Sequence, residues 1–232
     1  MAIKILSIET ATRSCSVCLS KDGQPWIVRE VQSQSGHAEQ LTLFIQEVMQ
    51  MANLNLQELD AIAVSKGPGS YTGLRIGIST AKGLCYALDK PMLAIDTLKA
   101  LAFGAIQDYY NPKAAYVALM DARRMDAYVG VYTADYEILK APYFATLAPT
   151  TFDDLLEHPA IDEIVLVGDA VEKYQDICTT SPLKISTVQL PSSKHLSWLA
   201  YLAYQAEQTV DVAYFEPFYL KKPNITKPKP KF

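Results

Sequence analysis

The chain runs twice through the same order of predicted elements, strands first and then alternating helices and strands, and this order limits the folds open to it. In the first half, continuous apolar runs predict strands, and apolar residues recurring every three or four positions predict helices. These elements are strands at Ile3–Ile8, Cys15–Leu19 and Trp26–Val31, a helix at His37–Ala52, a strand at Ala61–Ser65, a helix at Tyr71–Leu88, a strand at Met92–Ile95 and a helix at Leu98–Gln107.

The second half begins again with strands and continues in the same way. Its predicted elements are strands at Ala114–Met120, Tyr128–Thr133 and Ile138–Ala145, a short helix at Thr151–Glu157, a strand at Ile164–Val167, helices at Ala170–Cys178 and Ser197–Gln208, and a last strand at Tyr214–Leu220. We therefore expect two duplicated α/β units, although no close sequence repeat accompanies the pattern.

Composition narrows the class of protein. The 232 residues are 50% hydrophobic and 20% charged, which is enough to bury a core and excludes wholesale disorder. No apolar run approaches the roughly 18–20 residues of a membrane span, so the sequence excludes an integral membrane protein. Near the amino end, Glu9 interrupts the chain before any apolar stretch of signal length, so we expect a cytoplasmic protein.

The four cysteines indicate structural thiols. Cys15 and Cys18 have the spacing of a CxxC motif, but they fall in a predicted strand, where residues three apart point to opposite faces. Cys85 and Cys178 add no second CxxC motif. Free thiols are typical of a reducing compartment.

Charge is unevenly spread along the chain. The net charge is −4, but residues 221–232 carry five lysines and no acid, which leaves 16 basic and 25 acidic residues, or −9, in the rest. An acidic body argues against wide phosphate binding over its surface. The basic tail suits either plain solvation or contact with RNA or an acidic partner, and we expect it to be extended and mobile.

The predicted helix His37–Ala52 carries more apolar surface than one face needs. Leu43 and Met49 fall outside its main apolar stripe. That stripe comprises Ala38, Leu41, Ile45, Val48 and Ala52, widened by Phe44 and Met51. A helix that is apolar beyond one face indicates either tight packing under a loop or a partner helix.

The predicted helix Tyr71–Leu88 contains three interior glycines, Gly73, Gly77 and Gly83, each of which costs about 1 kcal/mol relative to alanine. Gly73, Gly77 and Ala81 share one ridge and would let another backbone approach closely. Replacing Gly77 by leucine is therefore expected to disrupt partner association, or the fold itself if Gly77 packs inside the subunit.

Motifs for independent chemistry are weak. The three histidines, His37, His158 and His195, have no partner at metal-ligand spacing, and the chain has no Gly-x-Ser-x-Gly elbow. The turn at 67–70, Gly-Pro-Gly-Ser, suits an anion at a helix amino terminus, but a sharp chain reversal explains it equally well.

Three segments carry a family resemblance. The opening "ILSIETATRSCSVCL", the segment "SKGPGSYTGLRIGISTAKGLCYAL" and the later "DARRMDAYVGVY" resemble the TsaB (YeaZ) family of bacterial tRNA threonylcarbamoyladenosine biosynthesis proteins. "LVGDAVEKY" and "EPFYLKK" are similar to that family as well. The resemblance implies an actin-like, chaperone-ATPase-like (ASKHA) α/β fold, made of two related halves that each have a mixed sheet and flanking helices.

The resemblance also implies departures from TsaD, the related catalytic subunit. The metal-binding histidines of TsaD fall here on Thr97 and Leu101. Its glycine-rich phosphate turn is replaced by the segment 121–124, Asp-Ala-Arg-Arg, the adenosine-binding Gly-Gly turn of the wider fold is reduced to Gly168-Asp169, and the first phosphate loop has Glu9-Thr10-Ala11 instead of Asp-x-Gly. We therefore expect no catalytic residue, no metal and no cofactor, with any nucleotide held at the subunit boundary of a complex.

The leading hypothesis is a non-catalytic scaffold and activator in the complex that adds threonylcarbamoyl to the tRNA adenosine beside the anticodon. The family implies TsaD and the ATPase TsaE as partners, a pathway link to a TsaC-type enzyme, a homodimer when the protein is alone, and tRNA contact through the complex.

Two other hypotheses stay open. One is an independent ATP-binding enzyme of the sugar-kinase and actin superfamily, for which Glu9, Asp96 and Asp121 are candidate metal–phosphate carboxylates unless they cap turns or form surface pairs. The other is an RNA-binding module that uses the lysine tail.

We predict an amino-terminal half at residues 1–98, a carboxy-terminal half at 99–220 and a tail at 221–232. The partner interface is predicted on the two apolar helices of the first half, at His37, Gln40, Leu41, Phe44, Glu47, Tyr71, Leu74, Arg75, Gly77, Ile78 and Ala81. A residual phosphate loop is predicted at Glu9, Thr10, Gly67 and Gly69.

Overall fold

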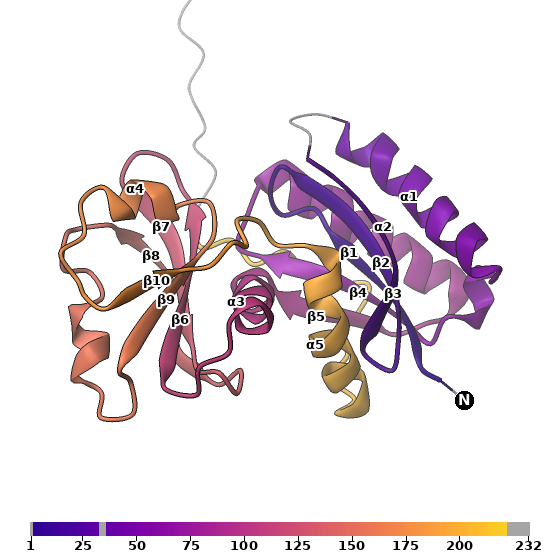
Figure 1. Cartoon of the computed structure of the whole chain (residues 1–232). Coiled ribbons are helices and arrows are strands. Elements are labelled where there is room, and N and C mark those ends of the chain that lie inside the picture. Colours follow the sequence, from indigo (N-terminus) through magenta and orange to yellow (C-terminus); the bar gives the residue numbers. More distant parts are fainter. Residues whose placement is uncertain (1, 33–35, 222–232) are drawn as a thin grey trace, which may run out of the picture.

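The computed structural model describes residues 2–32 and 36–221, which form two α/β halves side by side (Figure 1). The part of the predicted mobile tail beyond residue 221 lies outside the described residues. In the described ranges, no helix is both long enough and apolar enough to cross a membrane.

The first half contains a five-stranded mixed sheet in the order β3-β2-β1-β4-β5. Its first three strands form an antiparallel meander, and β4 and β5 continue parallel to β1. The strands are β1 (Lys4–Glu9), β2 (Ser14–Lys21), β3 (Gln24–Gln32), β4 (Ala61–Gly67) and β5 (Met92–Asp96).

The second half repeats this topology. From its meander edge the order is β8-β7-β6-β9-β10, with β6, β7 and β8 antiparallel and β9 and β10 parallel to β6. The strands are β6 (Ala114–Asp121), β7 (Asp126–Tyr132), β8 (Ile138–Thr146), β9 (Glu163–Val167) and β10 (Leu183–Ile185). The prediction of two related α/β units is confirmed, although the three-residue β10 was not predicted.

Helices cover both faces of the first sheet, which explains why β1 is apolar on both sides. Leu6 and Ile8 pack in one cluster with α1 (His37–Ala52) and α2 (Tyr71–Leu88), whereas Ile5 packs on the opposite face with α3 (Thr97–Asp108) and α5 (Ser193–Gln205). α3 also packs on the second sheet and so lies between the halves (Figure 1). The other face of the second sheet carries α4 (Val171–Gln175) and the short helix Asp153–Glu157, and Leu56–Glu58 forms one further short turn.

The two strand cysteines point to opposite faces, as their spacing predicted. The Cys15 Sγ lies 3.8 Å from the His37 carbonyl oxygen at the start of α1, and the Cys18 Sγ lies 3.2 Å from the Ser197 Oγ of α5. All four cysteines are free.

The bounds of α1 and α2 match the predicted helices, but the apolar face of α1 was assigned incorrectly in part. Met49, which was placed outside the stripe, is buried, whereas Met51, which was placed in it, is 55% exposed, and Ala38 is also exposed. The buried residues of α1 are spaced by three and four positions, and Met49, four residues after Ile45, falls on that face whereas Met51 does not.

The last part of the chain, from α5 to residue 221, differs most from the sequence-based prediction. The last helix begins at Ser193 rather than Ser197 and packs on the first sheet, so residues 99–220 are not one packing unit. The predicted strand Tyr214–Leu220 is wrong. Residues 214–220 join neither sheet. The side chains of Phe215 and Tyr219 pack on the α1–α2 core, and the Phe218 N–H donates a single hydrogen bond to the Lys66 carbonyl of β4.

The glycine ridge of α2 packs against the subunit's own β1–β2 turn. A Cβ on Gly73 would lie 2.1 Å from the Thr10 carbonyl oxygen, and a Cβ on Gly77 would lie 2.3 Å from the Thr10 Oγ1. The backbone that approaches the ridge is therefore intramolecular, which corrects the expectation of a partner there. A Cβ added to Gly83, in contrast, would meet no atom within 4 Å.

A matched pair of substitutions distinguishes the closely packed Gly77 from the unpacked Gly83. Gly77→Leu should lower the free energy of unfolding by about 3 kcal/mol or more, because the leucine overpacks a closed contact. Gly83→Leu should leave it unchanged or raise it by up to about 1 kcal/mol, because leucine is a better helix former than glycine. Urea unfolding followed by circular dichroism measures both, and equal losses would contradict the assignment.

Candidate functional site

A cavity of about 770 Å³ opens between the two halves. Its walls come from the β1–β2 turn, the amino end of α2, the β6–β7 hairpin and the carboxy-terminal segment. The side chains and backbone that line it belong to Ala11, Thr12, Arg13, Gly36, His37, Pro68, Gly69, Ser70, Tyr71, Thr72, Gly73, Ile76, Met120, Asp121, Ala122, Arg123, Tyr128, Asp169, Tyr219, Leu220 and Lys221. We call this cavity the cleft.

The predicted phosphate loop turns mostly inward. Of its four residues, only Gly69 lines the cleft. The Gly67 N–H donates to the Thr97 Oγ1 at 3.1 Å, and the Ser70 N–H donates to the Ala11 carbonyl at 2.6 Å. These two amides are therefore already bonded inside the subunit and are not directed to a ligand.

Glu9 and Thr10 lie in the interior rather than in the cleft. The Glu9 Oε1 accepts the Ala11 N–H at 2.6 Å, and the Thr10 hydroxyl donates to the Gly73 carbonyl at 2.8 Å. Burial raises the pKa of the Glu9 carboxyl to about 7, although its hydrogen bond from the Ala11 N–H opposes the rise. Glu9 thus closes the turn that supports α2.

The two positions at which the family resemblance would place metal-binding histidines are also closed. Thr97 accepts the Gly67 N–H, and Leu101 is fully buried against the second sheet. Asp96 caps α3 by accepting the Lys99 N–H at 3.0 Å, and burial raises its pKa. Across the described part of the chain, no three His, Cys, Asp or Glu side chains are grouped to hold a metal ion.

His37 and His195 lie in different parts of the first half and do not contact each other. His37 contacts the Thr12 carbonyl at 2.9 Å through its Nε2, while His195 is buried against Gly104, where burial lowers its pKa to about 4. His195 is therefore a neutral core side chain at physiological pH.

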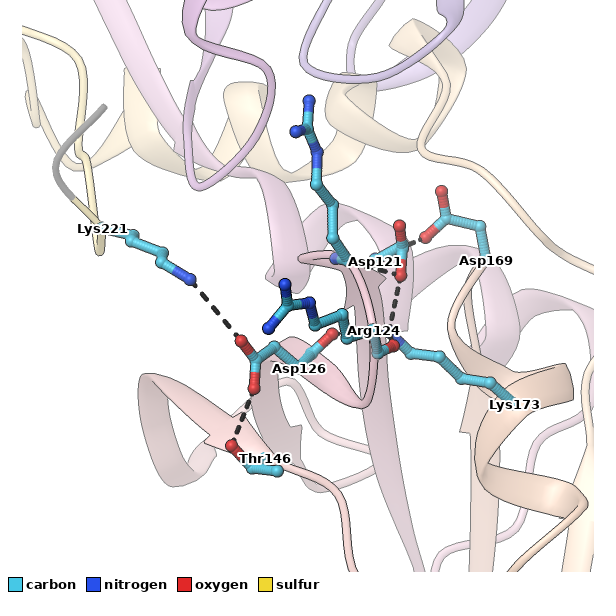
Figure 2. Close-up of polar contacts among 8 residues, drawn as sticks. Asp121, Arg124, Asp126, Thr146, Asp169, Lys173 and Lys221 are labelled. Carbon is cyan, nitrogen blue, oxygen red and sulfur yellow. Dashed lines mark hydrogen bonds and ion pairs between the residues drawn. The ribbon is translucent and has the colours of Figure 1, made fainter. Parts of the chain in front are cut away.

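The β6–β7 hairpin forms a network of charged groups at the cleft (Figure 2). The Lys173 ammonium pairs with Asp121 and donates to the Arg124 carbonyl at 2.9 Å, and the Asp169 Oδ1 accepts the Asp121 N–H at 2.8 Å. Burial raises the pKa of Asp169. Asp121 is thus engaged in a surface ion pair.

The same network ties the carboxy-terminal segment to the second half. The Lys221 Nζ lies 3.5 Å from the Asp126 carboxylate, which also accepts the Thr146 hydroxyl at 2.7 Å (Figure 2). The Thr146 hydrogen bond holds the pKa of Asp126 below its usual value. Sequence reasoning noted the bulk of the Arg-Arg segment but did not predict that Arg13, Tyr219 and Lys221 meet it at one cleft, because these residues are distant in the chain.

The predicted interface residues divide into two groups. Leu41, Phe44, Leu74, Gly77, Ile78 and Ala81 are buried in the subunit's own core, so their side chains do not form a surface. The other five, His37, Gln40, Glu47, Tyr71 and Arg75, are exposed or half-buried.

Apolar side chains that the prediction omitted extend the exposed surface of α1 and α2. Leu43 is 47% exposed, Met51 is 55% exposed and Tyr86 is 88% exposed. Together with Gln40, Glu47 and Arg75, they form what we call the α1–α2 outer face, whereas His37 and Tyr71 line the cleft. Leu43 is the one for which the sequence held a signal, because it lay outside the predicted core stripe.

Comparison with known proteins identifies relatives over nearly the whole chain. Residues 28–228 match the family described as "TsaD: tRNA N6-adenosine threonylcarbamoyltransferase". The tRNA threonylcarbamoyladenosine biosynthesis protein TsaB of Escherichia coli (strain K12) is 30% identical over 223 residues, covering 94% of this chain and 95% of that protein. TsaB of Haemophilus influenzae is 27% identical and covers 94% of both.

Solved structures agree with this result. YeaZ from Pseudomonas aeruginosa is 26% identical, with a TM-score of 0.82 over 94% of this chain and 100% of that one. An inorganic polyphosphate/ATP-glucomannokinase from Arthrobacter, at 9% identity and a TM-score of 0.53, covers 88% of this chain and 99% of that one and shares the fold alone. The expected actin-like fold of two α/β halves is confirmed.

The buried Glu9 predicts a pH dependence of stability. Its pKa is about 7 in the folded protein and near 4.5 in the unfolded chain, so its stabilising contribution is present below pH 4.5 and is lost as the pH rises through 7. Glu9→Gln keeps an oxygen for the Ala11 N–H without a titrating proton. The variant should gain about 3 kcal/mol relative to the parent between pH 4.5 and pH 8, measured by urea unfolding. A difference that does not change with pH would contradict the buried, protonated carboxyl.

Proposed function

This chain belongs to the TsaB (YeaZ) family, and on that premise we propose that it is a non-catalytic subunit that binds and activates a TsaD-type threonylcarbamoyltransferase. At the coarser level, it takes part in the biosynthesis of threonylcarbamoyladenosine in tRNA, as the names of its relatives state. The proposal concerns how it does so.

The observation that carries the proposal is the state of the positions that do chemistry in the catalytic relatives. Thr97 and Leu101 stand where metal-binding histidines are expected, and both are used inside the subunit. Glu9, Asp96 and Asp121, the candidate carboxylates of an independent enzyme, respectively close a turn, cap α3 and pair with Lys173. Each group thus has a structural role that accounts for it.

A transferase relative supports the choice of partner. The tRNA N6-adenosine threonylcarbamoyltransferase of Staphylococcus haemolyticus is 36% identical over 108 residues, which covers 39% of this chain and 31% of that enzyme. Two chains of related sequence can pair through equivalent helices, as in the symmetric interfaces of homodimers. The homodimer, the ATPase TsaE and the TsaC-type enzyme belong to the same proposal.

The α1–α2 outer face is the surface that fits this partner. α1 and α2 lie on the face of the first sheet opposite α5, and their amino ends reach the cleft beside the second half (Figure 1). This face carries the exposed apolar side chains Leu43, Met51 and Tyr86 and the half-buried polar side chains Gln40 and Glu47. Apolar side chains mixed with polar ones in this way are typical of protein interfaces.

The proposal predicts a surface variant that loses the partner and keeps the fold. Leu43→Glu/Met51→Glu should weaken association with the TsaD-type enzyme roughly tenfold or more, because it places two charges in an apolar contact. Ile138→Glu, at a residue of β8 that is 57% exposed in the other half, is the control and should change association less than about twofold.

Co-purification and a threonylcarbamoyl-transfer assay, with and without this chain, make the measurement. The isolated chain should show no transfer activity, and the double variant should fail to stimulate the enzyme while its unfolding transition stays unchanged. Transfer by the isolated chain, or full stimulation by the double variant, would refute the proposal.

The alternative, an independent ATP-binding enzyme, draws on the size of the cleft. Calorimetry with ATP and Mg²⁺ on the isolated chain tests it. We expect a dissociation constant of about 1 mM or weaker, since the Gly67 and Ser70 amides of the loop are bonded internally. Micromolar affinity would favour the alternative.

A further inference from the structure

Two arginines line the cleft without an ion-pair partner in the described ranges. Arg13 comes from the β1–β2 turn of the first half and Arg123 from the β6–β7 hairpin of the second, so positive charge approaches the cleft from both sides. Of the carboxylates of the cleft, Asp121 pairs with Lys173, and Asp169 accepts the Asp121 N–H and lies near Arg13 without forming an ion pair with it. Neither guanidinium group is held in an ion pair within the described ranges, so both can turn to an anion.

The hairpin holds its arginines in an unfavourable backbone conformation. Arg123 has a φ of 73° and Arg124 a φ of 50°, the left-handed region in which glycine is the easy residue. Such positions cost about 1–3 kcal/mol each and concentrate at functional sites. Lys173 secures the turn by donating to the Arg124 and Asp126 carbonyls (Figure 2). Backbone preference alone would favour glycine at both positions.

Aromatic side chains complete the walls. Tyr71, Tyr128 and Tyr219 line the cleft, and the Arg75 guanidinium stacks over the Tyr71 ring at 4.1 Å beside it. The amino end of the 18-residue α2, with its partial positive charge, points to the same space. Guanidinium groups with aromatic rings in a positive groove are typical of sites that follow a nucleic-acid backbone.

The sequence that follows the last cleft residue is also basic. Lys221 lines the cleft, and four further lysines follow in the sequence within the next ten residues, Lys222, Lys227, Lys229 and Lys231. The remainder of the chain is acidic, so this is a local basic region on an acidic body. The Gly67 and Ser70 amides, two of those that could cradle the phosphates of a single nucleotide, are bonded internally, so the cleft offers an anion mainly side-chain charge from both halves.

From these observations we propose that the cleft binds the phosphodiester backbone of RNA, with Arg13 and Arg123 contacting phosphates and Arg124 adding charge at the hairpin tip. This inference rests on the proposed function, because the pathway modifies tRNA. It assigns RNA contact to the folded cleft, beyond the lysine tail to which the sequence pointed.

The test is a fluorescence-anisotropy titration of the full chain with labelled, unmodified tRNA at several salt concentrations. Arg123→Gln/Arg124→Gln should weaken binding roughly tenfold and lower the salt slope by about 0.7–0.9 for each phosphate that is no longer neutralised. Arg123→Lys/Arg124→Lys, which keeps the charge, should retain most of the slope. Arg123→Gly/Arg124→Gly, which suits the left-handed backbone, should weaken binding to the same extent with the fold intact.

The control removes the same charge elsewhere. Lys90 and Lys113 precede the amino ends of β5 and β6, at the opposite end of the strands from the cleft. Lys90→Gln/Lys113→Gln should change the affinity less than about twofold. Equal weakening by the control, unchanged binding in the hairpin variants, or displacement of tRNA by ATP at micromolar concentration would each overturn the assignment.

A second measurement separates this inference from the proposed function. The hairpin variants should co-purify with the TsaD-type enzyme as well as the parent does, because the α1–α2 outer face is untouched. If they lose the enzyme instead, the arginines belong to that interface and the RNA assignment is wrong, while the proposed function stands. If the parent chain neither binds nor stimulates the enzyme, the proposed function fails whatever the tRNA titration gives.

Discussion

The contact between α2 and the β1–β2 turn organises the first half and, through it, the cleft. Gly69, Gly73 and Gly77 bring the helix so close to Thr10 and Ala11 that a Cβ on any of them would meet an atom of the turn within 2.5 Å. Three hydrogen bonds lock the arrangement, from the Thr10 hydroxyl to Gly73, from the Ser70 N–H to Ala11 and from the Ala11 N–H to Glu9. Backbone contact of this kind leaves no room for a ligand beneath the helix.

This packing decides which side of α2 is free. Since the glycine ridge and Leu74, Ile78 and Ala81 face the sheet, the helix presents Arg75, Gly83 and Tyr86 to the outside. The amino end of the helix meanwhile points into the cleft, where Tyr71 packs on Tyr219 with ring centroids 4.8 Å apart. One helix thus supplies both the candidate partner surface and one wall of the cleft.

The carboxy-terminal segment, residues 210–221, follows α5 in the sequence and connects the two halves. Val210 pairs with Met92 beside the first sheet, the Phe218 N–H bonds to Lys66, and Lys221 reaches Asp126 in the second half. The segment therefore follows the α1–α2 core and then crosses to the hairpin network. Its position makes the geometry of the cleft depend on residues from both ends of the chain.

Local patterns along the chain were enough to predict the duplicated α/β order, the bounds of α1 and α2, the opposed faces of Cys15 and Cys18 and, through its motifs, the family. Those features follow from periodicity, which a backbone of regular geometry converts directly into elements and faces. The tertiary structure determined that the Gly77 ridge is internal, that Met49 is buried and that Met51 is exposed. It also kept residues 214–220 out of the sheets and placed Arg13, Arg123 and Lys221 around one cleft. None of this could be predicted from local patterns. Periodicity states which side of an element is apolar, whereas the neighbour that covers it is chosen by long-range packing that no local pattern encodes.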